Sequence, residues 1–182
     1  LASANVRLQG IDGGDASGFA VSSAGDVNAD GYADLVVGAP TASPHGTYQA
    51  GEAYLVLGGP LLPAVIDLAS ADVRFEGIGF DDWVGMLVTA AGDVNGDGFG
   101  DVLLGAWHAS PNGDVRAGES YLVYGAVGLP AVIDLASADV RFQGIEPFEY
   151  AGADASGVGD VNGDGYDDLL IGSSYRSPGG DV

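Results

Sequence analysis

Three nine-residue stretches decide the fold: Asp26-Val-Asn-Ala-Asp-Gly-Tyr-Ala-Asp34, Asp93-Val-Asn-Gly-Asp-Gly-Phe-Gly-Asp101 and Asp160-Val-Asn-Gly-Asp-Gly-Tyr-Asp-Asp168. Each has Asp at positions 1, 5 and 9, Asn at position 3 and Gly at position 6. Successive stretches are 67 residues apart, and the segment Leu-Ala-Ser-Ala-(Asn or Asp)-Val-Arg recurs with the same period. A fixed period of this length indicates a repeat architecture in which each period is one structural unit. We therefore divide the chain into one array with repeats at 1–67, 68–134 and 135–182, the last of them truncated.

Each unit reads as four short strands. In the first unit we expect them at about residues 19–24, 34–38, 52–57 and 73–78, with the Asp-rich stretch between the first two. The second and third strands are nearly continuous apolar runs, which is typical of strands covered on both faces. Four covered strands per repeat indicate a β-propeller blade, in preference to a β-helix with fewer strands per unit or a sandwich. The predicted fold class is all-β, with blades of four antiparallel strands.

The chain is predicted to be a partial propeller. It opens with an isolated strand at about residues 5–11 and ends after two strands of the third unit, which gives about two and a half blades. Propellers close with about 4–8 blades. We expect the remaining blades to come from sequence outside this chain, and the alternative is that other chains complete the ring.

The Asp-rich stretches are predicted to hold divalent cations. Their pattern resembles the first half of an EF-hand loop, where positions 1, 3 and 5 give side-chain oxygens, position 7 gives a carbonyl and Gly allows the sharp turn. An all-oxygen set without His or Cys disfavours zinc and copper and suits Ca²⁺ better than Mg²⁺. We expect three Ca²⁺ sites, one per repeat, with the side chain at position 7 packed in the blade and only its carbonyl on the metal. The predicted ligands are Asp26, Asn28, Asp30, Tyr32 and Asp34; Asp93, Asn95, Asp97, Phe99 and Asp101; and Asp160, Asn162, Asp164, Tyr166 and Asp168.

The competing interpretation is turn chemistry, since Asp, Asn and Gly all favour turns. A turn needs one Asx and one Gly, whereas three Asp within nine residues repel one another unless a cation lies between them. Three copies in register therefore favour metal binding. We also expect these carboxylates to open the loop when metal is removed.

Composition narrows the class of partner. The net charge of −21 disfavours nucleic acid and anionic membrane surfaces. The chain has no Cys, which excludes disulfides and thiol chemistry. No apolar run approaches the roughly 18 residues of a membrane span, so no membrane insertion is expected. Because the chain begins at Leu1 without a signal peptide, we expect a processed form or a piece of something longer.

Other candidate residues favour structural interpretations. His45 and His108 are expected to be polar loop surface, and no Ser, His and acid combination suggests catalysis, so the chain is not expected to be an enzyme. Asp15-Ala-Ser17 and Asp154-Ala-Ser156 resemble fragments of a metal motif but fit turns better. The acidic residues Asp81, Asp82, Glu146 and Glu149 are read as solvated loop, with a cationic ligand as the alternative. The aromatic residues Trp83, Trp107 and Tyr175 break the repeat and are read as packing between blades, with a sugar-stacking platform as the alternative.

On these residues the sequence resembles the FG-GAP repeat family, which includes the blades of the integrin α-subunit propeller and of many bacterial surface proteins. The Asp-rich loop matches in all three units. The Gly-Ala-Pro element is complete only at Gly38-Ala39-Pro40, and the Phe-Gly element keeps its Gly at Gly18, Gly85 and Gly152. The resemblance implies that the calcium loops lie on one rim and are mainly structural, with ligands gripped on the opposite rim or between blades.

Three functions follow as hypotheses. The first is a calcium-rigidified module of an extracellular or cell-surface protein, acting in adhesion, protein interaction or assembly. The second is a lectin-like propeller with carbohydrate between blades at Trp83 or Trp107. The third is an accessory propeller of a secreted hydrolase.

Overall fold

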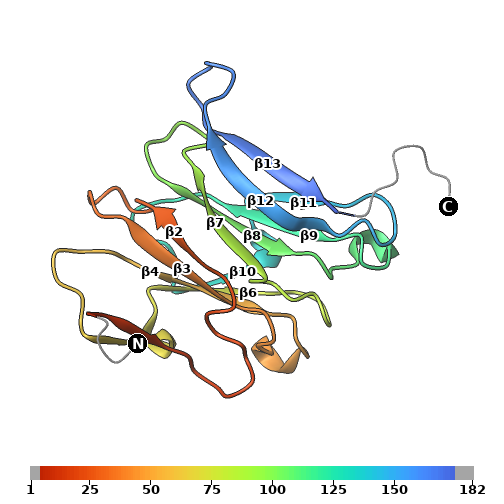
Figure 1. Cartoon of the computed structure of the whole chain (residues 1–182), viewed down its shortest axis with the longest axis horizontal. Coiled ribbons are helices and arrows are strands. Elements are labelled where there is room, and N and C mark those ends of the chain that lie inside the picture. The colour runs from red at the N-terminus through yellow and green to blue at the C-terminus, as the bar shows by residue number, and fades with distance from the viewer. Residues whose placement is uncertain (1–4, 175–182) are drawn as a thin grey trace.

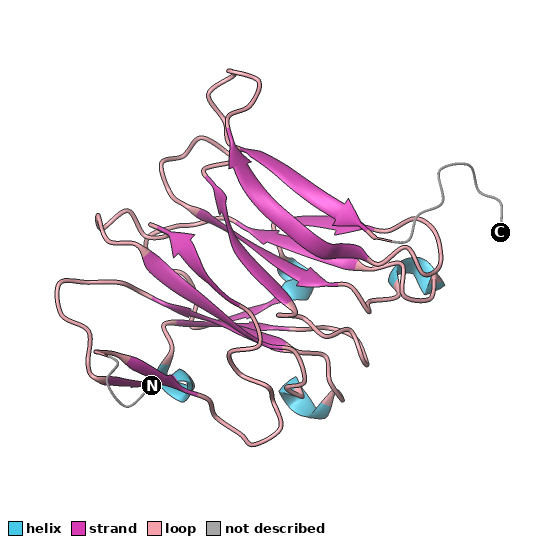
Figure 2. Cartoon of the chain, viewed as in Figure 1, coloured by secondary structure: helices cyan, strands magenta, loops and turns pink. Residues whose placement is uncertain are grey.

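The computed structural model describes residues 5–174 and shows sheets stacked side by side (Figure 1). The regular structure of the described residues is β-strand, apart from short 3-10 turns (Figure 2). The first blade contains β2 (Val21–Gly25), β3 (Asp34–Ala39), β4 (Glu52–Val56) and β6 (Val73–Glu76). The second contains β7 (Leu87–Gly92), β8 (Asp101–Ala106), β9 (Glu119–Val123) and β11 (Val140–Gln143). The third begins with β12 (Ala151–Gly159) and β13 (Asp168–Ser173).

Within each blade, strands adjacent in the sheet run antiparallel, in the orders β6-β4-β3-β2 and β11-β9-β8-β7. The prediction of an all-β partial propeller with four-stranded antiparallel blades is therefore confirmed, and the strands of the first blade end within two residues of their expected positions. The division of the sequence at 67/68 and 134/135 remains a prediction.

Two short strands were not predicted. They are β5 (Val65–Asp67) and β10 (Val132–Asp134), and they pair in parallel with β1 (Arg7–Gln9) and β6. The connection between the third and fourth strands of a blade thus reaches back to the outer strand of the preceding blade. Each short strand leads into a 3-10 turn whose first amides are capped by Asp67 or Asp134, as at Ala136 N to Asp134 Oδ1 (2.8 Å). These pairs tie neighbouring blades together at their outer edges.

The apolar core lies between the blades. Val36, Leu55 and Phe75 from the first blade pack with Val88 and Leu104 from the second. On the other face of the second blade, Leu103 and Leu122 pack against Leu169 and Ile171. Side chains that are adjacent along a strand point to opposite faces, so each blade contributes to two interfaces. Leu170 in β13 is 63% exposed, whereas its counterparts one and two repeats earlier, Leu103 and Val36, are fully buried.

The strand order places the connections on two rims. The Asp-rich loops at 26–34, 93–101 and 160–168 join the first two strands of their blades and form what we call the aspartate-loop rim (Figure 1). The opposite rim carries the connections at 40–51, 77–86, 107–118 and 144–150, including the 3-10 turns Pro44–Gly46 and Pro111–Gly113. None of residues 5–174 forms a helix long and apolar enough to cross a membrane.

Candidate metal centre

In each Asp-rich loop, the side chains at positions 1 and 3 converge on one backbone amide. In the first loop, Asp30 N donates to Asp26 Oδ1 (3.0 Å) and to Asn28 Oδ1 (3.1 Å). The next amide, Gly31 N, donates to Asp26 Oδ2 at 2.8 Å. The second and third loops repeat these bonds with distances of 2.8–3.1 Å. The side-chain oxygens at positions 1 and 3 thus meet at the backbone amide of position 5 in all three loops.

The carboxylate at position 5 bonds forward to the amide at position 7. The donors are Tyr32 N (2.9 Å), Phe99 N (3.0 Å) and Tyr166 N (3.0 Å). The intervening Gly31, Gly98 and Gly165 have φ of +89°, +90° and +93°, in the left-handed region that Gly enters without steric cost. The Gly at position 6 is therefore required by the turn itself.

Position 9 serves as an anchor, a role that the sequence analysis missed. Asp34 is fully buried and accepts from Val27 N and from Gly58 N, both at 2.7 Å. Asp101 is equally buried and bonds in the same way to Val94 N and Gly125 N, both at 2.9 Å. The glycine at 58 and 125, two residues after the third strand, was the available signal. That position 9 also completes a metal shell remains a prediction.

The aspartates of each loop lie close together, and their charges shift one another's pKa. Burial raises the pKa of Asp34, and the negative charges of Asp30 and Asp26 raise it further, against the two amide bonds that lower it. The pKa of Asp101 is raised in the same way, first by burial and then by Asp97 and Asp93. In the third loop, the amides led by that of Gly165 lower the pKa of the exposed Asp160. A bound cation would offset the repulsion between these neighbouring carboxylates.

The donor set fits a hard divalent cation in its chemistry. Within residues 5–174, no group of three or more His, Cys, Asp or Glu side chains is arranged so that it could hold a metal on its own. The predicted shell also draws on the Asn amide oxygen and the position 7 carbonyl. Carboxylate oxygens keep lone pairs beyond those that accept the loop amides. The expectation that the carboxylates open the loop when metal is removed stays a prediction.

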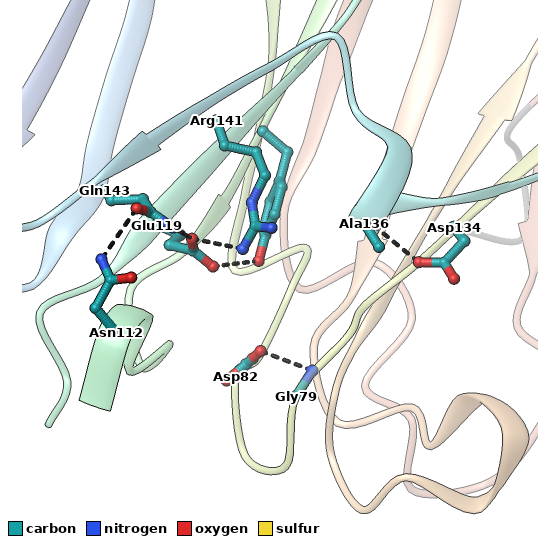
Figure 3. Close-up of polar contacts among 9 residues, drawn as sticks. Gly79, Asp82, Asn112, Glu119, Asp134, Ala136, Arg141 and Gln143 are labelled. Carbon is teal, nitrogen blue, oxygen red and sulfur yellow. Dashed lines mark hydrogen bonds and ion pairs between the residues drawn. The ribbon is translucent and has the colours of Figure 1, made fainter. Parts of the chain in front are cut away.

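Two of the acidic residues that were predicted to lie in solvated loops are buried. They are Asp82, between β6 and β7, and Glu149, before β12. Asp82 is 8% exposed and accepts from Gly79 N at 2.8 Å (Figure 3). Glu149 is 6% exposed and accepts from Ile145 N (2.8 Å) and Glu146 N (3.2 Å). Both carboxylates hold the turn that precedes them, because a short acidic side chain can bond to free amides of its own loop.

The two tryptophans pack between blades, as predicted. Trp83 meets Trp107 edge-on at 6.4 Å, and Trp107 lies 5.3 Å from Tyr150 of the next junction. Between them, His108 stacks on Trp83 at 3.8 Å, so the expectation of a polar surface histidine is wrong for this residue. Burial lowers the pKa of His108. Tyr175 lies outside the described residues.

The remaining candidates have local roles. His45 is exposed and its Nε2 lies 2.6 Å from Glu76 Oε2. Ser156 Oγ bonds to Gly157 O at 2.9 Å, and Asp15 bonds to Thr41 N (3.3 Å) through its backbone carbonyl. The turn interpretation agrees with the structure at Asp15-Ala-Ser17. It is wrong for Asp154-Ala-Ser156, which lies within β12 and pairs with β13.

Comparison with known proteins identifies the repeats. The profile of the FG-GAP repeat family matches residues 17–56, 87–123 and 152–182, each of which includes one Asp-rich loop. Integrin alpha-PS2 of Drosophila melanogaster is 30% identical over 178 residues, covering 93% of this chain and 12% of the relative. Phosphatidylinositol-glycan-specific phospholipase D of Bos taurus is 36% identical over 166 residues, covering 90% of this chain and 19% of the relative.

A third relative, Integrin alpha pat-2 of Caenorhabditis elegans, is 30% identical over 166 residues, covering 81% of this chain and 12% of the relative. The chain therefore spans less than a fifth of each of these relatives. The family profile matches more than half of the chain, in register with the blades. The chain belongs to the FG-GAP repeat family.

Proposed function

We propose that this chain is a calcium-binding propeller segment of an extracellular or cell-surface protein, acting in adhesion, protein interaction or assembly. The observation that carries the proposal is the convergence of the side-chain oxygens at positions 1 and 3 on the backbone amide of position 5, which recurs in all three loops. The membership of the family supports a module that binds other proteins and has no catalytic role of its own.

In each loop, the side chains at positions 1, 3 and 5, the carbonyl at position 7 and the carboxylate at position 9 would hold Ca²⁺. When bound, the ion supplies positive charge that offsets the mutual repulsion of the carboxylates. The residues at positions 6 and 9 hold the loop in the shape that the ion requires. The position 9 carboxylate fixes the loop to its blade, and the Gly at position 6 makes the turn that brings the ligands together.

Thermal unfolding tests the proposal. A ligand that binds only the folded state stabilises by about 2.7 kcal/mol per site when its free concentration is 100 times Kd. We expect millimolar CaCl2 to raise the melting temperature by several degrees over EGTA, with MgCl2 giving a smaller effect. The variant with Asp30→Asn, Asp97→Asn and Asp164→Asn should lose this response.

Asp12→Asn is the matched control, because it makes the same charge change at an exposed residue outside the loops. It should respond to calcium as the unmodified protein does. A melting temperature that is the same in calcium and in EGTA would contradict the proposal.

A second candidate function is an accessory propeller of a secreted hydrolase. The match to the bovine phospholipase D favours it, because that relative is an enzyme by name and the matched part is 19% of its length. The sequence that flanks this chain in its gene is the test. A hydrolase domain there would support this candidate, and further FG-GAP repeats alone would count against it.

The lectin-like alternative stays a prediction. Trp83 and Trp107 are partly exposed, and their rings pack against each other, His108 and Tyr150. This packing favours a structural role for the two rings, so we do not propose a glycan as the partner.

A further inference from the structure

The second and third Asp-rich loops are bonded to each other across the junction between their blades. Asp167, at position 8 of the third loop, bonds to the backbone of Asp93, the first residue of the second loop. The amide of Asp167 donates to Asp93 O at 3.1 Å, and its side-chain oxygen Oδ2 accepts from Asp93 N at 2.9 Å. The backbone N–H and C=O of Asp93 are thus both held by one half-buried residue of the next blade.

Two glycines make room for this contact. The Asp167 side chain lies over Gly92, the last residue of β7, where a Cβ atom would collide with Asp167 Oδ2. The ring of Tyr166 lies against Gly96 of the second loop, where a Cβ atom would be 2.6 Å from Tyr166 Cε1. Because glycine has no side chain, the third loop can approach the second this closely.

The junction between the first and second blades has half of this contact. Gly100, at position 8 of the second loop, donates its amide to Asp26 O at 2.8 Å, as Asp167 does to Asp93. Gly100 has no side chain that could accept from Asp26 N. The backbone bond is therefore common to the two junctions, and Asp167 adds the side-chain bond at the second.

Asp93 supplies position 1 of the predicted metal shell in the second loop. Its carboxylate accepts from Asp97 N at 3.0 Å and from Gly98 N at 2.9 Å. A group that is already fixed in position loses less conformational freedom when it binds. Hydrogen-bond partners of metal ligands orient those ligands, and removing such a partner typically weakens metal binding by about 10–100-fold.

We propose that Asp167 is a positioning residue for the metal site of the second loop, so that this site is assembled from two blades. Asp167 acts through the backbone of Asp93 and is not itself placed in the metal shell. Its negative charge also attracts a cation to the second loop. The inference rests on the proposed function, because it concerns the calcium site proposed at residues 93–101.

A calcium titration followed by NMR on the full 182-residue chain tests the proposal. The amides of Gly31, Gly98 and Gly165 report the three loops separately, because each donates to the position 1 carboxylate of its own loop. Asp167→Ala should weaken calcium binding in the second loop by about tenfold. The first loop lies two blades away from Asp167 and is the internal control, so its affinity should not change.

The substitution to alanine is compatible with the fold, because Ala33 occupies the same position in the first loop. The melting temperature in EGTA checks this.

Asp167→Asn separates the hydrogen bond from the charge. Both variants lose the negative charge, but the Asn oxygen can still accept from Asp93 N. We expect Asn to restore the affinity of the second loop to within about threefold of the unmodified protein, since an exposed charge contributes little through water and salt. In the third loop the two variants should bind calcium equally.

Hydrogen exchange of the Asp93 amide in EGTA gives a readout that needs no metal. Exchange should be faster in Asp167→Ala than in Asp167→Asn, because the amide has lost its acceptor.

Unchanged second-loop affinity in Asp167→Ala would overturn the proposal, and so would equal second-loop affinities of the Ala and Asn variants. Either result leaves the proposed function standing if the loops of the unmodified protein respond to CaCl2. The absence of any calcium response at Gly31, Gly98 and Gly165 would overturn both.

Discussion

The two rims of the blades are built from the ends of the same strands, yet they keep the repeat differently. On the aspartate-loop rim, positions 1, 3, 5, 6 and 9 are the same in all three loops. On the opposite rim, His45 and Glu76 of the first blade become Asn112 and Gln143 in the second. On the aspartate-loop rim the same bonds recur in each loop, whereas the contacts on the opposite rim are specific to each junction between blades.

The pKa values of two aspartates, Asp160 on the aspartate-loop rim and Asp82 on the opposite rim, shift in opposite directions. The amides of the third loop lower the pKa of Asp160, whereas burial first, then Glu119 and Asp81, raise the pKa of Asp82 to about 6 against the amide of Gly79 and Arg141. Loop amides thus favour the ionised form of the exposed Asp160, whereas burial disfavours it at Asp82, as it also does at the buried Asp34 and Asp101.

The anchor at position 9 gives the largest expected effect on the stability of the isolated chain. Asp101→Ala would leave the amides of Val94 and Gly125 without acceptors, and each buried unpaired group costs about 1–3 kcal/mol. We expect the free energy of unfolding to fall by about 3 kcal/mol, measured by urea denaturation.

Asp168→Ala is the comparison, since Asp168 is half-buried and bonds to one backbone amide, Val161 N. It should cost about 1 kcal/mol. Equal losses for the two variants would contradict the anchor role.

Asp82 should make stability depend on pH. Its folded pKa of about 6 lies above its ordinary value of 3.8, so the unfolded chain ionises first. The contribution of this residue to the free energy of unfolding therefore falls as pH rises from about 4 to about 6, by at most about 3 kcal/mol. Asp82→Asn removes this loss.

Urea denaturation of both proteins at several pH values measures the effect. The stability of Asp82→Asn relative to the unmodified protein should increase through this window and level off above it. A difference that stays constant from pH 4 to 7 would show that Asp82 ionises normally.

The smallest expected effect separates the two blades on the opposite rim. Tyr54 Oη donates a hydrogen bond to Glu52 Oε2, and among the described residues the Glu52 carboxylate accepts this one hydrogen bond. Tyr121 Oη makes the same bond to Glu119, which also holds Arg141 and Gln143. We expect Tyr54→Phe to cost about 2 kcal/mol and Tyr121→Phe about 1 kcal/mol in chemical denaturation. The reverse order would contradict the networks described here.

Most of the fold could be predicted from the sequence because the 67-residue period fixed the blade and the apolar runs fixed its strands. The strands β5 and β10 could not, because three residues of Val-Ile-Asp become a strand only beside the outer strand of another blade. The burial of Asp82 and Glu149 was missed for a similar reason. An acidic loop reads as solvated unless the amides that its carboxylates accept from are known.

The spacing predicted the candidate metal residues, and in the first loop the side-chain oxygens at positions 1 and 3 meet at the backbone amide of position 5. The anchoring of Asp34 and Asp101 depends on glycine amides 24 residues further along the chain, which a local motif does not reveal.

Calcium stoichiometry tests the central claim most directly. Isothermal titration of the metal-free protein with CaCl2 should give three bound ions per chain, and Asp97→Asn should lower the stoichiometry to two or weaken one site alone. No binding at millimolar calcium, or binding that is unchanged when the position 5 aspartates of all three loops are replaced by Asn, would contradict the account.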